Sequence, residues 1–114
     1  MKVYRVETDE GLGPYADLYL GNILPFGSTY DQPGPSDDGI LGHLWDSEHR
    51  FGFRSMEQLT AWFGDYAEQL HEVGLRIAVY EVNDRCRVVH GAKQLCFVRD
   101  EAKLLERKSL LEVA

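Results

Sequence analysis

Hydrophobic and polar residues alternate at the start of the chain, which predicts a first strand over residues 1–7 (MKVYRVE). The alternation places Val3, Arg5 and Glu7 on the same face of that strand. Further along, residues 75–82 (LRIAVYEV) are apolar at both alternating positions. This pattern is typical of a central strand whose two faces are both covered. The two segments together predict a sheet with a buried middle.

A helical period follows at residues 55–73, which we predict as the main helix of the protein. Ser55 and Gln58 have the spacing of a capping box at the start of a helix. In a capping box the Ser hydroxyl accepts from a backbone amide of the first turn that has no partner in the helix, and the Gln side chain accepts from the backbone amide at the cap. Gly74 follows the last apolar residue of this period, where helices commonly end at a glycine in the left-handed backbone conformation. Between these ends the apolar residues recur at spacings of three and four, at Met56, Leu59, Phe63, Tyr66, Leu70 and Val73. This stripe predicts a helix that packs one face against a sheet.

Shorter segments complete the predicted fold. Residues 49–53 (HRFGF) are predicted as a short strand, because they are rich in aromatic residues. Residues 86–90 and 93–99 are predicted as the two strands of a hairpin. After them, residues 101–107 are predicted as a short helix and residues 110–113 as an edge strand.

The order of these elements predicts an α+β fold, with one main amphipathic helix (about 55–73) packed on a mixed or antiparallel sheet of four to six strands. The length of 114 residues, with 44% hydrophobic and 27% charged residues, fits a single domain over residues 1–114. A long loop rich in Pro, Gly and Asp is predicted at about 21–39. Connections of this length are usually functional or disordered.

Several classes of protein are disfavoured by the same sequence. No apolar run approaches the roughly 20 residues of a membrane helix, and the first residues lack the apolar core of a signal peptide. We therefore expect a cytoplasmic protein with no membrane partner. Two cysteines are too few for a disulfide scaffold. If the hairpin turns at Gly91, Cys86 and Cys96 lie opposite one another, and we predict half-buried core thiols. No pattern of Lys, Arg or His clearly activates either one as a catalytic nucleophile, although His90 lies on the same predicted strand as Cys86.

Histidines and carboxylates gather just before the strand at 49–53. His43, Asp46 and His49 recur every three residues, a spacing at which a helix presents metal ligands on one face. Gly42 argues against such a helix, so we predict solvated polar side chains and no bound metal.

Negative charge is concentrated in the first half of the chain. The net charge is −7, and no Lys or Arg occurs between Val6 and His49. This distribution disfavours direct binding of nucleic acid, because neutralising phosphates requires clustered cations. A dense set of carboxylates is instead complementary to a basic groove that normally holds DNA or RNA. An excess of acid that serves solubility alone is the other explanation.

Several short motifs together resemble a group of small bacteriophage and prophage proteins. They are YRVE (4–7), GPY (13–15), PSDDG (35–39), FGFRSMEQLTAWF (51–63), VYEV (79–82) and KQLCF (93–97). Small acidic phage proteins of this size look like the anti-CRISPR class of host-defence inhibitors, which occlude the nucleic-acid path of a surveillance complex. The resemblance implies a DNA mimic in the cytoplasm of the bacterial host, with no catalytic residues and no cofactor. Its partner would be a basic nucleic-acid-binding protein or complex, held through Glu7, Asp9, Glu10, Asp31, Asp37, Asp38, Asp46 and Glu48.

A second resemblance implies a different function. Arg5 in the first strand, Ser55 ahead of the helix and Gln94 in a late strand look like the Arg, Ser and Glu arrangement of ADP-ribosyltransferase folds. The family uses NAD, and its Glu stabilises the developing oxocarbenium ion. A neutral amide at Gln94 does not supply that charge. The resemblance therefore implies an NAD-binding protein with weak or no transferase activity, using Arg5, Tyr15, Ser55 and Gln94.

Overall fold

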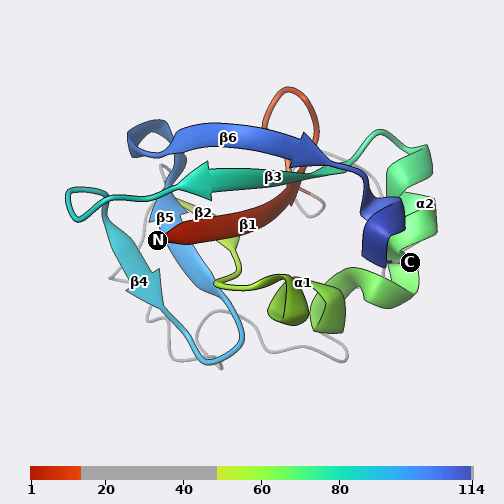
Figure 1. The fold of residues 1–114 in the computed structure, drawn as a ribbon, viewed down its shortest axis with the longest axis horizontal. Coiled ribbons are helices and arrows are strands. Elements are labelled where there is room, and N and C mark those ends of the chain that lie inside the picture. The colour runs from red at the N-terminus through yellow and green to blue at the C-terminus, as the bar shows by residue number, and fades with distance from the viewer. Residues whose placement is uncertain (14–48, 114) are drawn as a thin grey trace.

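The computed structural model describes residues 1–13 and 49–113. The described residues form six strands, two α-helices and three short 3₁₀ segments. Figure 1 labels the strands and the α-helices. In chain order the elements are β1 (Lys2–Glu7), β2 (His49–Gly52), α1 (Met56–Phe63), η2 (Gly64–Tyr66), α2 (Ala67–Glu72), β3 (Arg76–Glu81), β4 (Val88–His90), β5 (Leu95–Val98), η3 (Arg99–Glu101), β6 (Lys103–Lys108) and η4 (Leu110–Val113).

The strands form two antiparallel sheets of three strands each. The first has the order β1-β3-β6 and the second the order β2-β5-β4. A single bridge between Tyr4 of β1 and Phe53, just after β2, joins the sheets at a seam. The backbone amide of each of these two residues donates to the carbonyl of the other, at 2.9 and 2.8 Å. The predicted α+β class, with a main helix and four to six strands, is confirmed.

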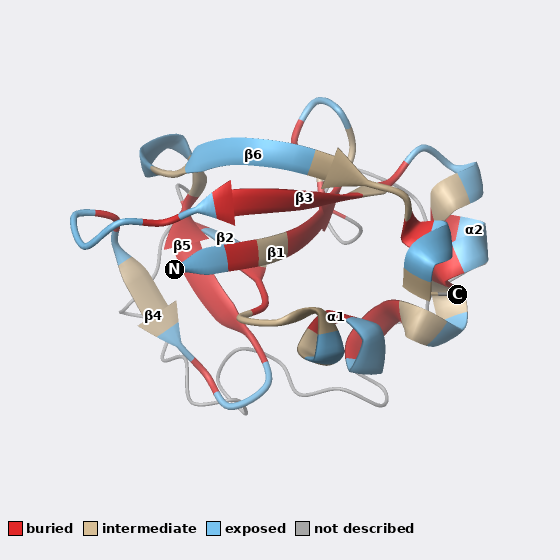
Figure 2. Ribbon diagram, in the orientation of Figure 1, coloured by how far each residue is buried: buried red, intermediate tan, exposed pale blue. Residues whose placement is uncertain are grey.

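The β1-β3-β6 sheet lies between the helices and the second sheet. On its helix side, Val6 and Ile77 pack into a core with Leu59 and Leu70. On its other side, Ala78 and its neighbours pack against β5 in a second core. Figure 2 shows β3 and β5 almost wholly buried, whereas β6 and the outer sides of the helices are exposed. The prediction that residues 75–82 form a central strand covered on both faces is therefore confirmed.

The main helix begins and ends where the sequence predicts. The Ser55 hydroxyl accepts from the Gln58 amide at 3.2 Å, and the Gln58 side chain reaches back to the amide of Arg54. The helix is interrupted at η2, where the turn tightens for three residues. At the other end Gly74 takes φ +100°, and the Leu75 amide donates to the Leu70 carbonyl at 3.0 Å. This is the left-handed helix end that only glycine adopts without cost.

Two predictions for the C-terminal segment are wrong. Residues 101–107, predicted as a helix, contain only the last residue of η3 and most of strand β6, which pairs antiparallel with β3. Residues 110–113, predicted as an edge strand, form η4, which lies beside α2 in Figure 1 and buries Leu110. The reason is tertiary. The buried strand β3 needs hydrogen-bond partners on both sides, and β6 satisfies its second side although its own pattern is not strand-like.

The two cysteines are buried and do not lie opposite one another. Cys96 lies in β5, between Phe51 of β2 and Val89 of β4. Cys86 precedes β4, and its thiol donates to the Val98 carbonyl at 3.6 Å. Burial raises the pKa of the Cys86 thiol, which is the opposite of what a nucleophilic cysteine requires. The possible pairing of Cys86 with Cys96 is therefore not realised.

The predicted loop at about 21–39 lies outside the described residues. The same holds for most of the possible metal ligands before His49. Within the described residues, no group of three or more His, Cys, Asp or Glu side chains is placed to hold a metal ion.

Candidate functional site

Three arginines surround one buried carboxylate at the end of β1. Glu7 is fully buried, and its carboxylate accepts from Arg5 Nε at 3.0 Å and from Arg99 Nη2 at 3.1 Å. Arg107 Nη2 lies 3.4 Å from Glu7 Oε2, and the Tyr80 hydroxyl lies 2.8 Å from both carboxylate oxygens. We call these five side chains the Glu7 cluster. They come from β1, β3, η3 and β6, so the cluster ties together segments that are distant in sequence.

The electrostatics of the Glu7 cluster follow from burial and mutual pairing. Burial is the largest cause that raises the pKa of Tyr80, to about 12, and the bond to Glu7 adds to it. Burial also lowers the pKa of Arg5, although the charge of Glu7 partly offsets this, and the nearby charge of Arg50 lowers it further. The hydrogen bond to Glu7 raises the pKa of Arg99. A buried carboxylate in such surroundings is retained because its partners replace the lost hydration.

The same arginines hold the turn that follows β1. Arg107 Nη1 donates to the Thr8 carbonyl at 2.9 Å, and Arg5 Nη2 donates to the Gly11 carbonyl at 3.3 Å. Gly11 takes φ +87°, and a Cβ on it would lie 2.8 Å from Arg99 Cζ. The backbone can therefore lie against the arginines only because this residue is a glycine. The cluster fixes the point from which the chain continues into residues 14–48.

The structure separates the predicted acidic residues into three groups. Glu7 is in the interior, which removes it from any acidic surface, because its carboxylate is enclosed by its own arginines. Asp9 and Glu10 are exposed in the turn after β1. The remaining predicted residues, Asp31, Asp37, Asp38, Asp46 and Glu48, lie outside the described residues. Whether any of these residues binds a partner stays a prediction.

The residues of the second resemblance lie along the seam between the sheets, except Tyr15, which lies outside the described residues. Arg5 follows Tyr4 of the bridge, and its Nη1 donates to the Phe51 carbonyl at 2.8 Å. Gln94 is buried and directly precedes Leu95, the partner of Gly52. Ser55 caps α1. The fold therefore brings these segments together, while Arg5 and Ser55 already have internal hydrogen bonds.

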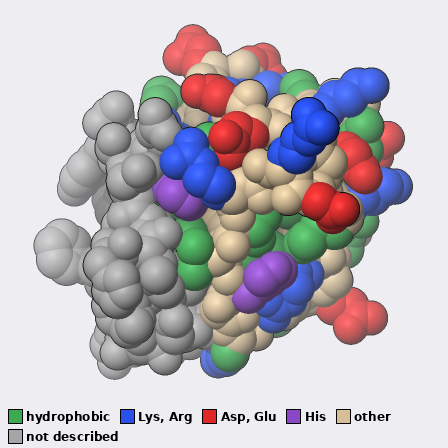
Figure 3. All heavy atoms as spheres, turned by 90° about the vertical axis from the view of Figure 1, so that its left-hand side faces the viewer, with side chains coloured by type: hydrophobic (Ala, Val, Ile, Leu, Met, Phe, Trp, Pro, Cys, Tyr) green, Lys and Arg blue, Asp and Glu red, His purple; other side chains and the backbone are tan. Residues whose placement is uncertain are grey.

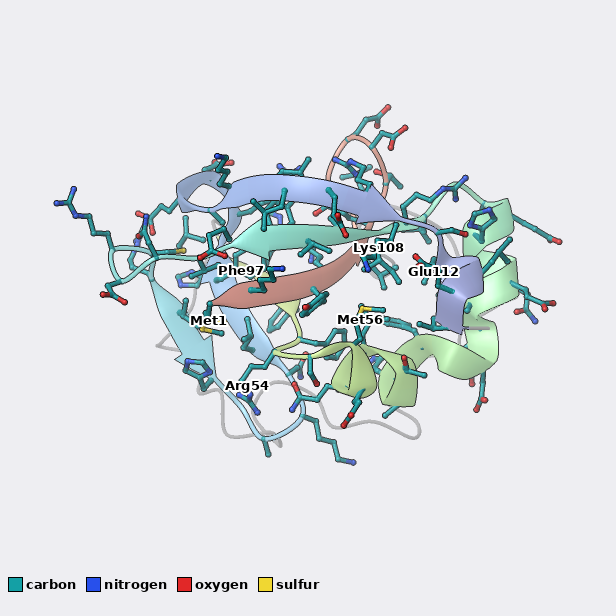
Figure 4. All side chains as sticks on the ribbon, viewed as in Figure 1. Met1, Arg54, Met56, Phe97, Lys108 and Glu112 are labelled. Atoms are coloured by element: carbon teal, nitrogen blue, oxygen red, sulfur yellow. The ribbon has the colours of Figure 1, made fainter. Side chains whose placement is uncertain are left out.

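Another arginine fastens the β4–β5 turn to the start of α1, close to the same seam. Arg54 donates to the Gly91 carbonyl at 2.9 Å and to the Ala92 carbonyl at 3.1 Å, and Nη1 lies 3.2 Å from His90 Nδ1. Figure 4 shows Arg54 beside this turn. These contacts hold the segment before Gln94 against the helix.

Charge is distributed unevenly between the described scaffold and the rest of the chain. Residues 1–13 and 49–114 contain all 12 basic residues and 13 of the 19 acidic residues. Figure 3 shows acidic and basic side chains interspersed on one described face. Residues 14–48, which we call the acidic segment, contain the other six acidic residues and no Lys or Arg. The acidic segment therefore supplies almost all of the net charge of −7.

Sequence reasoning missed three members of the Glu7 cluster: Tyr80, Arg99 and Arg107. One signal was present, because the alternation of residues 1–7 puts Glu7 on the face of the buried Val3. A carboxylate on a buried face requires cationic or hydrogen-bonding partners. Which of the distant arginines supply them depends on the pairing of β6 with β3, and this pairing was not predicted.

None of the helices in the described part of the chain is both long enough and apolar enough to cross a membrane. No curated protein and no solved structure matches the chain. A protein-family model, described as Bacteriophage T4 Y00F protein, matches residues 1–111, which is nearly the whole sequence. The chain therefore belongs to the Bacteriophage T4 Y00F protein family.

Proposed function

We propose that this phage protein is an inhibitory binding protein, an anti-CRISPR that uses its acidic segment to block nucleic-acid binding by a CRISPR surveillance complex of the infected host. The observation that carries the proposal is the separation of charge. The described scaffold holds nearly equal numbers of acidic and basic residues, whereas the acidic segment holds six carboxylates and no cation. A charge excess confined to one segment favours a binding role over a general contribution to solubility.

The physical basis is competition for a basic channel. A surveillance complex holds nucleic acid largely through the phosphate backbone, in a positively charged groove. Carboxylates that enter such a groove meet the same cations and exclude the phosphates. The scaffold supports this role because the Glu7 cluster anchors the turn from which the acidic segment departs, through bonds to the carbonyls of Thr8 and Gly11.

Affinity capture tests the proposal. The tagged protein is immobilised, lysate of a CRISPR-bearing bacterium is passed over it, and bound proteins are eluted with rising salt and identified. We expect stoichiometric recovery of a DNA- or RNA-binding complex that is released by salt and displaced by its target DNA, because salt screens exposed charge pairs. Recovery of no such complex by the folded protein would refute the proposal.

A second candidate function is NAD binding by an ADP-ribosyltransferase-like scaffold. The observation that favours it is the position of Arg5, Ser55 and Gln94 along the seam between the two sheets. The internal bonds of Arg5 and the neutral amide of Gln94 argue for binding without efficient transfer. If this function is correct, saturating NAD raises the melting temperature by mass action, and Gln94→Ala removes the shift. An unchanged melting temperature in wild-type protein excludes it.

A further inference from the structure

Positive charge exceeds negative charge in the Glu7 cluster. Three guanidinium groups, of Arg5, Arg99 and Arg107, share one buried carboxylate. Among the described residues, one further carboxylate pairs with the cluster, that of Asp9, which is 88% exposed and lies 3.8 Å from Arg107 Nη1. An exposed pair at that separation contributes little. The cluster therefore keeps a net positive charge among the described residues.

Two of these arginines are accessible and have unused donors. The Arg99 and Arg107 side chains are 28% and 24% exposed. Arg99 bonds through Nε and Nη2, and Arg107 through Nη1 and Nη2. Arg99 Nη1 and Arg107 Nε make no hydrogen bond within the described part of the chain. The cluster can therefore bind a further acceptor without losing Glu7.

The two accessible guanidinium groups are close together and held in place. Their Nη2 atoms lie 3.1 and 3.4 Å from the same oxygen, Glu7 Oε2. The two guanidinium groups therefore flank the same carboxylate oxygen, and their unused donors, Arg99 Nη1 and Arg107 Nε, belong to neighbouring planar groups. The Tyr80 hydroxyl accepts from Arg99 Nε at 2.7 Å, which fixes the orientation of that guanidinium. Preorganised arginines of this kind favour phosphate because their planar donors match its oxygens.

We propose that Arg99 and Arg107 form a binding site for a phosphate group, either a free phosphate ion or the phosphate of a nucleotide. The proposal depends on neither function above, because it uses neither the acidic segment nor the seam residues Ser55 and Gln94. Glu7 then serves to hold the arginines in place.

The test is thermal unfolding with inorganic phosphate, and separately with ADP, against chloride at equal ionic strength. Wild type is compared with Arg107→Gln and with Arg85→Gln, which changes an exposed arginine in the turn before β4. We expect phosphate to raise the melting temperature of wild type and Arg85→Gln with the same midpoint. Arg107→Gln needs at least about ten times more phosphate for the same shift. A lower midpoint for ADP than for phosphate identifies a nucleotide as the source of the group, and equal midpoints identify the free ion.

Two results would overturn the proposal: no shift in wild type, or equal shifts in all three proteins. If Arg107→Gln does not fold, NMR of the arginine side chains in wild-type protein tests whether phosphate binds at Arg99 and Arg107. The guanidinium signals of Arg99 and Arg107 then move on addition of phosphate while that of Arg85 does not. If all arginine signals move equally, phosphate binds as an adventitious ion only, and the proposed site is rejected.

Discussion

The Tyr80 hydroxyl lies 2.8 Å from both carboxylate oxygens of Glu7, although 73 residues separate the two in sequence. The contact joins β1 to β3 across the first sheet, and both side chains are almost completely buried. Arg99 Nε donates to the same hydroxyl, so Tyr80 connects the carboxylate to one of its cations. Glu7 is therefore a structural residue at the centre of a network, rather than a surface acid.

Removing the charge of Glu7 is expected to destabilise the protein strongly. Glu7→Gln leaves three guanidinium groups around a neutral amide, and breaking a buried pair by removing one partner costs roughly 3–5 kcal/mol. The measurement is urea unfolding at neutral pH. Glu10→Gln, in the exposed turn nearby, is the matched control and is expected to change the stability by less than about 0.5 kcal/mol. Similar stabilities of the two variants would contradict the buried network.

Tyr80 is expected to make stability depend on alkaline pH. Its folded-state pKa is raised to about 12, above the unfolded value of 10.0, first by burial and then by Glu7. The folded protein therefore keeps this proton where the unfolded chain has lost it, so the contribution is complete below pH 10 and is lost between about pH 10 and about pH 12. The loss amounts to about 3 kcal/mol, because each tenfold difference in proton affinity corresponds to about 1.4 kcal/mol. Urea unfolding across this range should show a steeper decline for wild type than for Tyr80→Phe; parallel declines would be inconsistent with the raised pKa.

Replacing Gly74 by alanine is expected to strain only the backbone, whereas replacing Gly11 by alanine also brings the new Cβ too close to a side chain. Both have positive φ, but a Cβ at Gly74 meets nothing within 4 Å, whereas one at Gly11 meets Arg99 Cζ at 2.8 Å. Gly74→Ala is expected to cost about 1 kcal/mol and Gly11→Ala clearly more. In an Arg99→Ala background the extra cost at Gly11 should disappear, which a double-mutant cycle measures. Equal costs in both backgrounds would show that Arg99 does not pack against this turn.

Ser55 is expected to act through the helix it caps. Ser55→Ala removes the bond to the Gln58 amide and should lower the free energy of unfolding by about 1 kcal/mol. Thr60→Ala, within the same helix, removes only an exposed bond to the Met56 carbonyl and should change it by less than about 0.5 kcal/mol. Denaturant unfolding compares them. Loss of NAD binding with no change of stability in Ser55→Ala would instead favour the second candidate function.

Local signals in the sequence were sufficient for the first strand, the central strand and the main helix. The alternation of residues 1–7, the apolar run of 75–82 and the ends at Ser55 and Gly74 each follow from short-range physics. They agree with the structure because tertiary packing reinforces the local preference in each case.

The errors occur where tertiary pairing decides the structure. Residues 103–108 carry four charges and no clear strand alternation, yet they form β6 because β3 has an open side. The burial of Glu7 was missed for a related reason, since Arg99 and Arg107 approach it only after β5 and β6 are in place. The charge excess of residues 14–48, in contrast, is a property of the sequence itself and needs no structure to be recognised.

The central claim is that the acidic segment binds a basic nucleic-acid channel, and a pair of matched charge reversals tests it most directly. One variant carries Asp31→Lys, Asp37→Lys and Asp38→Lys; the other carries Glu57→Lys, Glu68→Lys and Glu72→Lys, which change exposed residues of α1 and α2. The two have the same net charge, so long-range attraction is equal and only the location of the charge differs. Affinity for the captured complex is measured by titration, with melting temperatures as the check on folding.

The account predicts that reversal in the acidic segment weakens binding by at least about a hundredfold without changing the melting temperature, while reversal on the helices weakens it by less than about tenfold. Binding that survives reversal in the acidic segment, or that falls equally in both folded variants, would contradict it.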